Sequence, residues 1–344
     1  MAWQFFARPN WDDQLTGGSH FIMEERGMEK QEKQFVWMDG KMVEKEKAVV
    51  PIMTHALHYG TGVFEGIRIY QTPKGRAVFR LRDHMVRFQN SAKALNMTLP
   101  FSVDEMCEAV RETVRVNPSR MDYIRPIAYF GTNDQDKIVL NPASFSTNVA
   151  VALAYMGAYL GKENLEKGAK IITSSWKKPS NESTSLQAKI CGNYVNSVLC
   201  KIESNMQGAD EGLMLNSNGS VAEGPGENIF VVRNGKIFTP SIASGVLEGI
   251  TKDSVVVIAK DLGYEVVERE ITRSEIWIAD EFFMTGTAAE VTPCGYLDGR
   301  AVGNGKRGPI TAHIQEIFFD AARGNDPKYD HWLDYVEVKK KKKK

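Results

Sequence analysis

Three Asn-Gly or Asp-Gly dipeptides constrain the fold of this chain more than any other feature of its sequence. Asp39-Gly40, Asn218-Gly219 and Asn234-Gly235 each separate two short apolar runs. Such a dipeptide readily takes the positive φ angles of a two-residue hairpin turn, so each one predicts a pair of antiparallel strands. Antiparallel sheet must therefore make up a large part of the structure.

Helices are predicted between these hairpins. Ser102 and Glu105 form a capping box that opens a helix, which ends before Pro118. Thr251 is predicted to cap a second helix, which Gly263 closes. The mixture of helices and antiparallel strands predicts an α+β fold.

Composition narrows the class of protein. A length of 344 residues predicts about two domains, and 42% hydrophobic with 25% charged residues is typical of a globular protein. The 43 basic residues balance 43 acidic ones only because residues 339–344 are all lysine, so the rest of the chain is acidic. An acidic body argues against a nucleic-acid partner.

The sequence also indicates a compartment. No stretch is apolar for the roughly 20 residues that a membrane span needs, so no membrane partner is expected. The four cysteines lack the spacing of a metal site or a disulfide framework. We therefore expect free thiols in a reducing compartment, and a cytoplasmic protein.

Shifts in composition predict the domain boundaries. An apolar run gives way at residues 156–161 to two glycines, and then to a charged segment. The predicted divisions are a leader or disordered tag at 1–27, a small α+β domain at 28–155, an interdomain loop at 156–166, a large domain at 167–338 and a lysine tail at 339–344.

One lysine stands in unusual surroundings. Lys189 lies among small and apolar residues ahead of a predicted helix start. Most lysines are solvated, but a lysine in an apolar environment can have a lowered pKa and react as a Schiff-base amine. From the surroundings alone, both interpretations stay open.

Three further segments are candidates for ligand contact, and two of them suit an anion. Glu223 precedes a Gly-Pro-Gly turn, where it either contacts a ligand or caps local amides. The start of the helix at Thr251 and the small-residue turn at 285–290 can both present N–H groups to an anion, although Thr251 could equally be a structural cap. Two such turns and one lysine suggest a phosphorylated aldehyde cofactor.

His55 and His58 lack a third ligand, so no metal site is predicted.

Several longer motifs resemble those of the branched-chain amino acid aminotransferases, class IV enzymes that use pyridoxal 5′-phosphate (PLP). The resemblance runs from about Phe35 to Trp332 and rests on segments 55–68, 123–126, 157–161, 185–194, 221–230, 249–251 and 285–290. It implies fold type IV, with a small α/β domain and a larger domain that has a pseudo-barrel β core. The implied reaction is ping-pong transfer of an amino group from Leu, Ile or Val to 2-oxoglutarate.

The resemblance also implies a role for individual residues. Lys189 would be the catalytic residue and bind the PLP aldehyde covalently. The other cofactor contacts would be Glu223 at the ring nitrogen, Tyr194 at the ring hydroxyl, and Arg87, Ile250, Thr251 and Thr287 at the phosphate. Helical periodicity alone, by contrast, places Arg87 on the solvent side of its helix.

Substrate contacts follow from the same motifs. The substrate site would comprise Tyr59, Phe64, Tyr123 and Tyr159 around an apolar side chain, Arg125 at a distal carboxylate, and the backbone of Thr287 and Ala288 at the α-carboxylate. The expected partners are an amino acid, a 2-oxo acid, and further copies of the chain in a homodimer or homohexamer. The alternatives are a D-amino acid or (R)-amine transaminase, aminodeoxychorismate lyase chemistry, and a non-catalytic PLP-binding protein.

Overall fold

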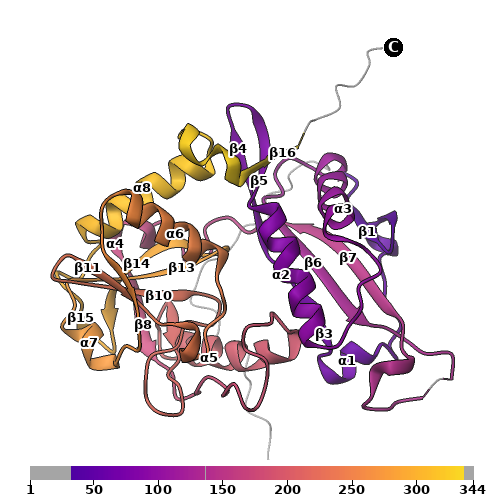
Figure 1. Ribbon diagram of the computed structural model, residues 1–344, viewed down its shortest axis with the longest axis horizontal. Helices are drawn as coiled ribbons and strands as arrows, with labels where there is room; N and C mark the ends of the chain where they lie inside the picture. The colour runs from indigo at the N-terminus through magenta and orange to yellow at the C-terminus, as the bar shows by residue number, and fades with distance from the viewer. Residues whose placement is uncertain (1–31, 136, 337–344) are drawn as a thin grey trace, which may run out of the picture. The chain divides into compact units, whose positions relative to one another are not determined.

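The strands form two eight-stranded sheets (Figure 1). The computed structural model describes residues 32–135 and 137–336, so the leader at 1–27 and the lysine tail predicted above lie outside the described residues. Within the described ranges, no helix is long and apolar enough to cross a membrane. Together with the helices, the two sheets make the fold α+β, as predicted.

The first sheet is antiparallel throughout. Its strand order is β16-β5-β4-β6-β7-β1-β2, and β3 pairs with β6. The strands are β1 (Phe35–Met38), β2 (Lys41–Glu44), β3 (Gly62–Phe64), β4 (Ile67–Thr72), β5 (Gly75–Phe79), β6 (Tyr123–Phe130), β7 (Thr147–Ala154) and β16 (Leu333–Tyr335). The helices of this region are α1 (His55–Tyr59), α2 (Leu81–Ala94) and α3 (Val103–Val116).

The second sheet is mixed, with the order β12-β11-β10-β13-β14-β8-β9, and β15 pairs with β14. Its strands are β8 (Ala169–Thr173), β9 (Glu211–Leu213), β10 (Asn228–Arg233), β11 (Lys236–Thr239), β12 (Val266–Glu268), β13 (Glu281–Gly286), β14 (Glu290–Leu297) and β15 (Arg300–Ala301). After β9, the isolated bridge Leu215↔Val221 closes a local loop, and the bridge Ser220↔Thr272 links that loop to the chain after β12. The Val221 amide also donates to the Ile271 carbonyl, so these contacts connect the two edges of the sheet, as a pseudo-barrel requires.

The remaining helices belong to the second half of the chain. They are α4 (Asn164–Lys167), α5 (Tyr194–Met206), α6 (Ile250–Asp261), α7 (Arg273–Trp277) and α8 (Pro309–Ala322). Short 3₁₀ turns lie at Lys45–Lys47, Pro142–Ser144, Cys191–Asn193, Ile242–Ser244 and Pro327–Trp332. The division into two domains at 156–166 stays a prediction, and β16 returns the end of the chain to the first sheet.

Alternating side chains explain how the sheets are covered. In β10, Phe230 and Val232 pack with apolar residues of α6 and α8, while Ile229 and Val231 face a second cluster on the other side of the sheet. In the first half of the chain, α2 and α3 pack on the first sheet, with Phe88 and Val110 in a cluster that includes Ile124. Both sheets thus bury apolar side chains with a period of two residues.

The turn predictions are confirmed at two of three positions. Asp39 and Gly40 have φ angles of 46° and 87°, Asn234 and Gly235 have 52° and 75°, and each pair joins two antiparallel strands. Asn218-Gly219 is wrong as a two-residue primed turn, because Asn218 has no positive φ angle and the loop spans residues 216–220. The antiparallel pairing around it is present, since Leu215 and Val221 form a bridge and the Met214 amide donates to the Glu223 carbonyl. The strand before this loop, β9, pairs in parallel with β8.

One of the two helix-cap predictions is confirmed, and the other is wrong. The capping box of Ser102 and Glu105 is present at the start of α3. Thr251 is not the cap of α6, because the helix begins one residue earlier and Gly249 occupies the N-cap position. Thr251 lies instead in the first turn, where it is 4% exposed.

Candidate active site

The segment that carries Lys189 is fixed to the first sheet through its backbone. The Phe64 amide donates to the Lys189 carbonyl over 3.1 Å, and the Lys189 amide donates to Ser91 Oγ on α2 over 2.9 Å. Gly60 and Gly192 pack backbone against backbone beside it, where a Cβ on Gly60 would lie 2.8 Å from the Gly192 Cα. These contacts leave the Lys189 side chain to extend away from the sheet's backbone.

A cavity surrounds the Lys189 side chain and includes all of the residues predicted to contact the cofactor. Its lining residues are Arg87, Lys189, Tyr194, Glu223, Pro225, Gly226, Glu227, Asn228, Leu247, Gly249, Ile250, Thr251, Thr285, Gly286 and Thr287. The lining comes from α2, from the starts of α5 and α6, from the start of β10 and the end of β13, and from the turns next to these two strands.

Burial changes the chemistry of Lys189. Removal from water, assisted by the positive charge of Arg87, lowers the pKa of its amine to about 7. A substantial fraction of the amine is therefore uncharged near neutral pH, as a nucleophile requires. Lys189 Nζ and Tyr194 Oη form a hydrogen bond of 2.5 Å, and burial raises the pKa of that hydroxyl.

Three donors hold the Glu223 carboxylate. Lys178 Nζ donates to Oε1 over 2.5 Å, and the Leu247 amide and Asn228 Nδ2 donate to Oε2 over 3.0 and 3.3 Å. The approach of Asn228 depends on a glycine, because a Cβ at Gly249 would lie 1.9 Å from Asn228 Oδ1. The carboxylate is thus fixed in the cavity wall.

Arg87 does not point to solvent, so the expectation from helical periodicity is wrong. Its side chain is 13% exposed and makes a bidentate pair with Glu65, and Nη1 donates to the Glu248 carbonyl over 2.7 Å. Periodicity identifies only the face that α2 turns to its own sheet. The other face of α2 contacts the segment before α6, which the pattern cannot reveal.

Three predicted substrate residues lie in one cluster next to Lys189. Lys189 Nζ is 4.9 Å from the centre of the Phe64 ring, and the Arg125 guanidinium lies 4.6 Å from the same ring. Arg125 Nη2 donates to Tyr123 Oη over 3.4 Å. The Tyr123 hydroxyl also requires Gly66, because a Cβ there would lie 1.9 Å from it.

The other two tyrosines of the predicted substrate site are placed differently. Tyr159 hydrogen-bonds Glu211, and the Lys201 ammonium lies 5.3 Å from its ring centre. Tyr59 is not among the lining residues of the cavity. It lies on α1, is 39% exposed, and packs its ring 4.7 Å from that of His55.

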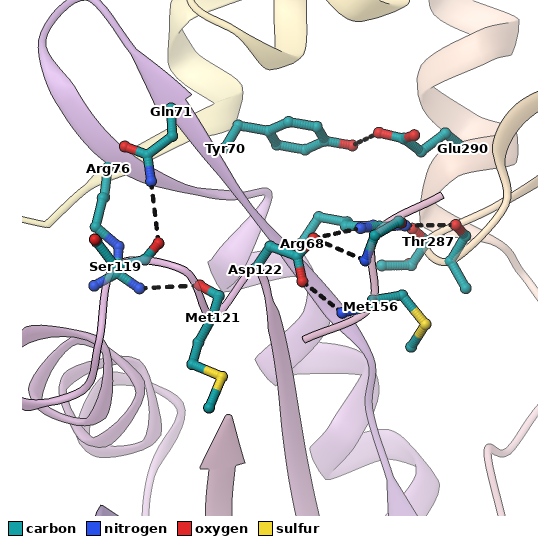
Figure 2. A network of polar contacts seen from close by, with 12 residues as sticks. Arg68, Tyr70, Gln71, Arg76, Ser119, Met121, Asp122, Met156, Thr287 and Glu290 are labelled. Atoms are coloured by element: carbon teal, nitrogen blue, oxygen red, sulfur yellow. Dashed lines mark hydrogen bonds and ion pairs between the residues drawn. The ribbon is translucent and has the colours of Figure 1, made fainter. Parts of the chain in front are cut away.

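Sequence reasoning missed the arginine that joins the predicted substrate turn to the segment 156–166, for which the sequence predicts an interdomain loop (Figure 2). Arg68 Nε donates to the Thr287 carbonyl, and Nη2 donates to the carbonyls of Ala288 and Gly157. Its Nη1 pairs with Asp122, which in turn accepts the amides of Met156 and Gly157. The only signal in the sequence was a charged residue within an otherwise apolar strand.

Comparisons with known proteins agree with this geometry. A model of the amino-transferase class IV family matches residues 62–295. The chain is 45% identical to a branched-chain-amino-acid aminotransferase of Escherichia coli (strain K12) over 302 residues, which are 88% of this chain and 97% of that protein.

This chain belongs to the class IV aminotransferases. Within them it belongs to the branched-chain-amino-acid aminotransferase family, and two solved structures support the same assignment. A branched-chain amino acid aminotransferase from T.th., solved with pyridoxamine 5′-phosphate, is 48% identical, with a TM-score of 0.84, over 89% of this chain and 99% of that one. Its complex with N-(5′-phosphopyridoxyl)-L-glutamate matches with 47% identity and a TM-score of 0.83, over the same shares of the two chains. The fold is accordingly fold type IV and the cofactor is PLP, as predicted.

Proposed function

We propose that this PLP-dependent aminotransferase transfers the amino group of L-leucine, L-isoleucine or L-valine to 2-oxoglutarate by a ping-pong mechanism. The observation that carries the proposal is the position of Lys189. Its amine, with a pKa of about 7, lies in the cavity whose wall includes the fixed Glu223 carboxylate, and is 4.9 Å from the centre of the Phe64 ring.

The residues of the cavity fit PLP. Thr285 Oγ1 is buried there with no hydrogen-bond partner in the described part of the chain. The two turns at Gly226 and Gly286 approach so closely that a Cβ on Gly286 would lie 2.8 Å from the Gly226 carbonyl. The donors at one end of the cavity, Arg87 and the first turn of α6, suit a phosphate, since N–H groups at a helix start favour anions.

Each residue then has a function that follows from its chemistry. Lys189 would bind the cofactor, and its amine, once free, would move the proton from the substrate Cα. Glu223 would pair with the ring nitrogen and Tyr194 with the ring hydroxyl, while Arg87, Ile250, Thr251 and Thr287 would hold the phosphate. When bound, PLP supplies an electron sink at the substrate Cα and carries the amino group between the two half-reactions.

The substrate side needs an apolar wall together with a cation. Phe64 and Tyr123 would contact the branched side chain, and Arg125 would receive the distal carboxylate of glutamate or 2-oxoglutarate. The trans peptide between Thr287 and Ala288 directs its N–H away from Arg68, which binds its carbonyl. This orientation supports binding of the α-carboxylate by the backbone of Thr287 and Ala288.

Two rivals share the fold. A D-amino acid or (R)-amine transaminase would use the same cofactor residues with another substrate face, and a non-catalytic PLP-binding protein would bind the cofactor without turnover. The test records near-visible absorption of the PLP-loaded enzyme before and after L-leucine, and separately before and after D-alanine. We expect loss of the band with L-leucine alone, together with release of the matching 2-oxo acid. Loss with D-alanine alone, or with neither, would refute the proposal.

The acceptor and the order of events need a second measurement. With 2-oxoglutarate as the second substrate, initial rates should give parallel double-reciprocal lines, as a ping-pong mechanism requires. Intersecting lines, or no glutamate formed, would contradict it.

The assembly state stays a prediction. We propose a homodimer or homohexamer in which Tyr59 contributes to the pocket of a neighbouring subunit, because in a single chain it is 39% exposed on α1. The exposed stripe of Val195, Val198, Ile202 and Met206 on α5 supports burial against another copy. Light scattering after gel filtration would test this, and a monomer with full activity would contradict it.

A cytoplasmic location also stays a prediction.

A further inference from the structure

One carboxylate behind the cavity is enclosed completely by the protein. The Glu65 side chain is 0% exposed and lies between the end of β3 and helix α2. Arg87 donates to it through Nε over 2.7 Å and Nη2 over 2.8 Å, and the His84 ring bonds Oε2 through Nδ1 over 2.8 Å. Glu65 is not among the residues that line the cavity, so it would act through another residue.

The pairing leaves part of Arg87 for a ligand. A guanidinium has five N–H donors, of which Glu65 takes two and the Glu248 carbonyl takes one. Two donors remain, one on each terminal nitrogen. Because a guanidinium is planar and rigid, fixing one of its edges also fixes the direction of the remaining donors.

The burial of Glu65 keeps the Arg87 side chain in this orientation. An arginine on the outer face of a helix could extend into water at little cost, whereas a fully enclosed carboxylate is costly unless it is paired. Glu65 is ionised, because its two partners together hold the pKa of its carboxyl well below its usual range against the effect of burial. Burial lowers the pKa of the His84 ring, so His84 supplies a neutral N–H rather than a second charge.

We propose that Glu65 is a positioning residue for the phosphate of PLP. It holds the Arg87 guanidinium by one edge and directs the two remaining donors to the phosphate. His84 fixes Glu65 from the other side. The inference rests on the proposed function, since it assumes that this cavity takes PLP.

The test compares two probes that differ only in the phosphate. PLP and pyridoxal share the ring and the aldehyde, so a residue that acts through the phosphate must affect PLP alone. Dissociation constants of both are measured by equilibrium dialysis for the wild type, Glu65→Gln, Arg87→Gln and the double variant. We expect Glu65→Gln to raise the dissociation constant of PLP by about 10-fold to 100-fold, a typical loss when an orienting partner is removed. The dissociation constant of pyridoxal should stay unchanged.

The double variant shows whether Glu65 acts through Arg87. If it does, Glu65→Gln should change PLP affinity by less than about 2-fold once Arg87 is already Gln, because the two losses are not additive. Independent effects that multiply would overturn the proposal. Unchanged or tighter PLP binding by Glu65→Gln would also overturn it, because that result is expected if only the lost negative charge mattered. Equal weakening of PLP binding and pyridoxal binding would overturn it as well.

Folding and the proposed function are controlled separately. Circular dichroism checks each variant, and if Glu65→Gln does not fold, Glu65→Asp replaces it. Aspartate keeps the charge but is one methylene too short to hold both Arg87 donors, so it should also weaken PLP and spare pyridoxal. A wild type that binds no PLP would refute the proposed function itself, whereas normal PLP binding in both variants would refute only the role of Glu65.

Discussion

Two largely enclosed arginines near the cavity differ in what accepts their N–H groups. Arg68 donates to three main-chain carbonyls and to Asp122. These contacts connect β4 with the 156–166 segment and the turn after β13 (Figure 2). Arg87 donates to a side-chain carboxylate and to one carbonyl, and two of its donors remain. The first arrangement uses the guanidinium to fix backbone segments, and the second leaves part of it for a ligand.

The difference separates stability from binding. Loss of Arg68 would leave Asp122 without its ion-pair partner and three carbonyls without this donor, and it would release the turn that carries Thr287. Loss of Arg87 would remove donors from the cavity, and it would also leave the enclosed Glu65 carboxylate without its ion-pair partner and the Glu248 carbonyl without this donor. We therefore expect changes at Arg68 to affect folding alone, and changes at Arg87 that keep a positive charge for Glu65 to affect cofactor affinity most.

The largest effect is expected from removing the amine of Lys189, in the cavity near which both arginines lie. Lys189→Ala should lower kcat by at least about 10⁴-fold, because the residue would both bind the cofactor and move the proton. The rate of 2-oxo acid formation measures this, and Lys260→Ala, an exposed lysine on α6, is the control. Substantial turnover by a folded Lys189→Ala enzyme would show that the cavity has another function.

Arg68→Met should have the next largest effect, on stability. Removing a mostly buried arginine from its ion pair costs about 3 kcal/mol of unfolding free energy. Urea denaturation measures this, with Arg82→Met as the control because the Arg82–Asp104 pair is exposed and should matter little. If Arg68→Met unfolds at the wild-type urea concentration, the backbone segments do not depend on it and the comparison fails.

The contrast between the arginines also shows how far the sequence alone reaches. Local signals worked where the structure is local: the hairpins at Asp39-Gly40 and Asn234-Gly235, and the Ser102 capping box, depend only on neighbouring residues. Asn218-Gly219 failed as a two-residue turn because the loop is longer and Asn218 has no positive φ angle, although Leu215 and Val221 still pair antiparallel.

The pocket residues were found through long motifs and not through periodicity. The apolar pattern of α2 describes only one face of the helix, so it assigned Arg87 to solvent. The pattern cannot reveal Glu65, which lies 22 residues away in sequence and pairs with Arg87. The sequence could not identify the acceptors of Arg68, because the one at Ala288 lies 220 residues away. A charged residue in an apolar segment indicates burial with a partner, but it does not say which partner.

Arg87→Lys sharpens the comparison at the cofactor end. Lysine keeps the charge but lacks the rigid fork, so it cannot hold both Glu65 oxygens and also direct two donors into the cavity. We expect PLP affinity to fall by about tenfold or more, with less loss of stability than in Arg68→Met. Equilibrium dialysis and urea denaturation measure the two quantities, and a reversed order of effects would contradict the division of roles.

The smallest effect concerns the charge of Lys189 in the enzyme stripped of cofactor. Arg87 is a neighbouring cation that lowers the pKa of the Lys189 amine to about 7 in addition to burial, whereas Arg68 is not among the groups that affect it most. A positive neighbour disfavours the protonated amine, so Arg87→Gln should raise this pKa and Arg68→Gln should not. The rate of amine acylation at Lys189, followed by mass spectrometry against pH, reports the uncharged fraction. In Arg87→Gln the half-maximal rate should move to higher pH, while the exposed Lys260 shows no such move. An equal move in Arg68→Gln would mean that both arginines act on Lys189 through the fold, and that the distinction between fixing backbone and serving a ligand does not hold.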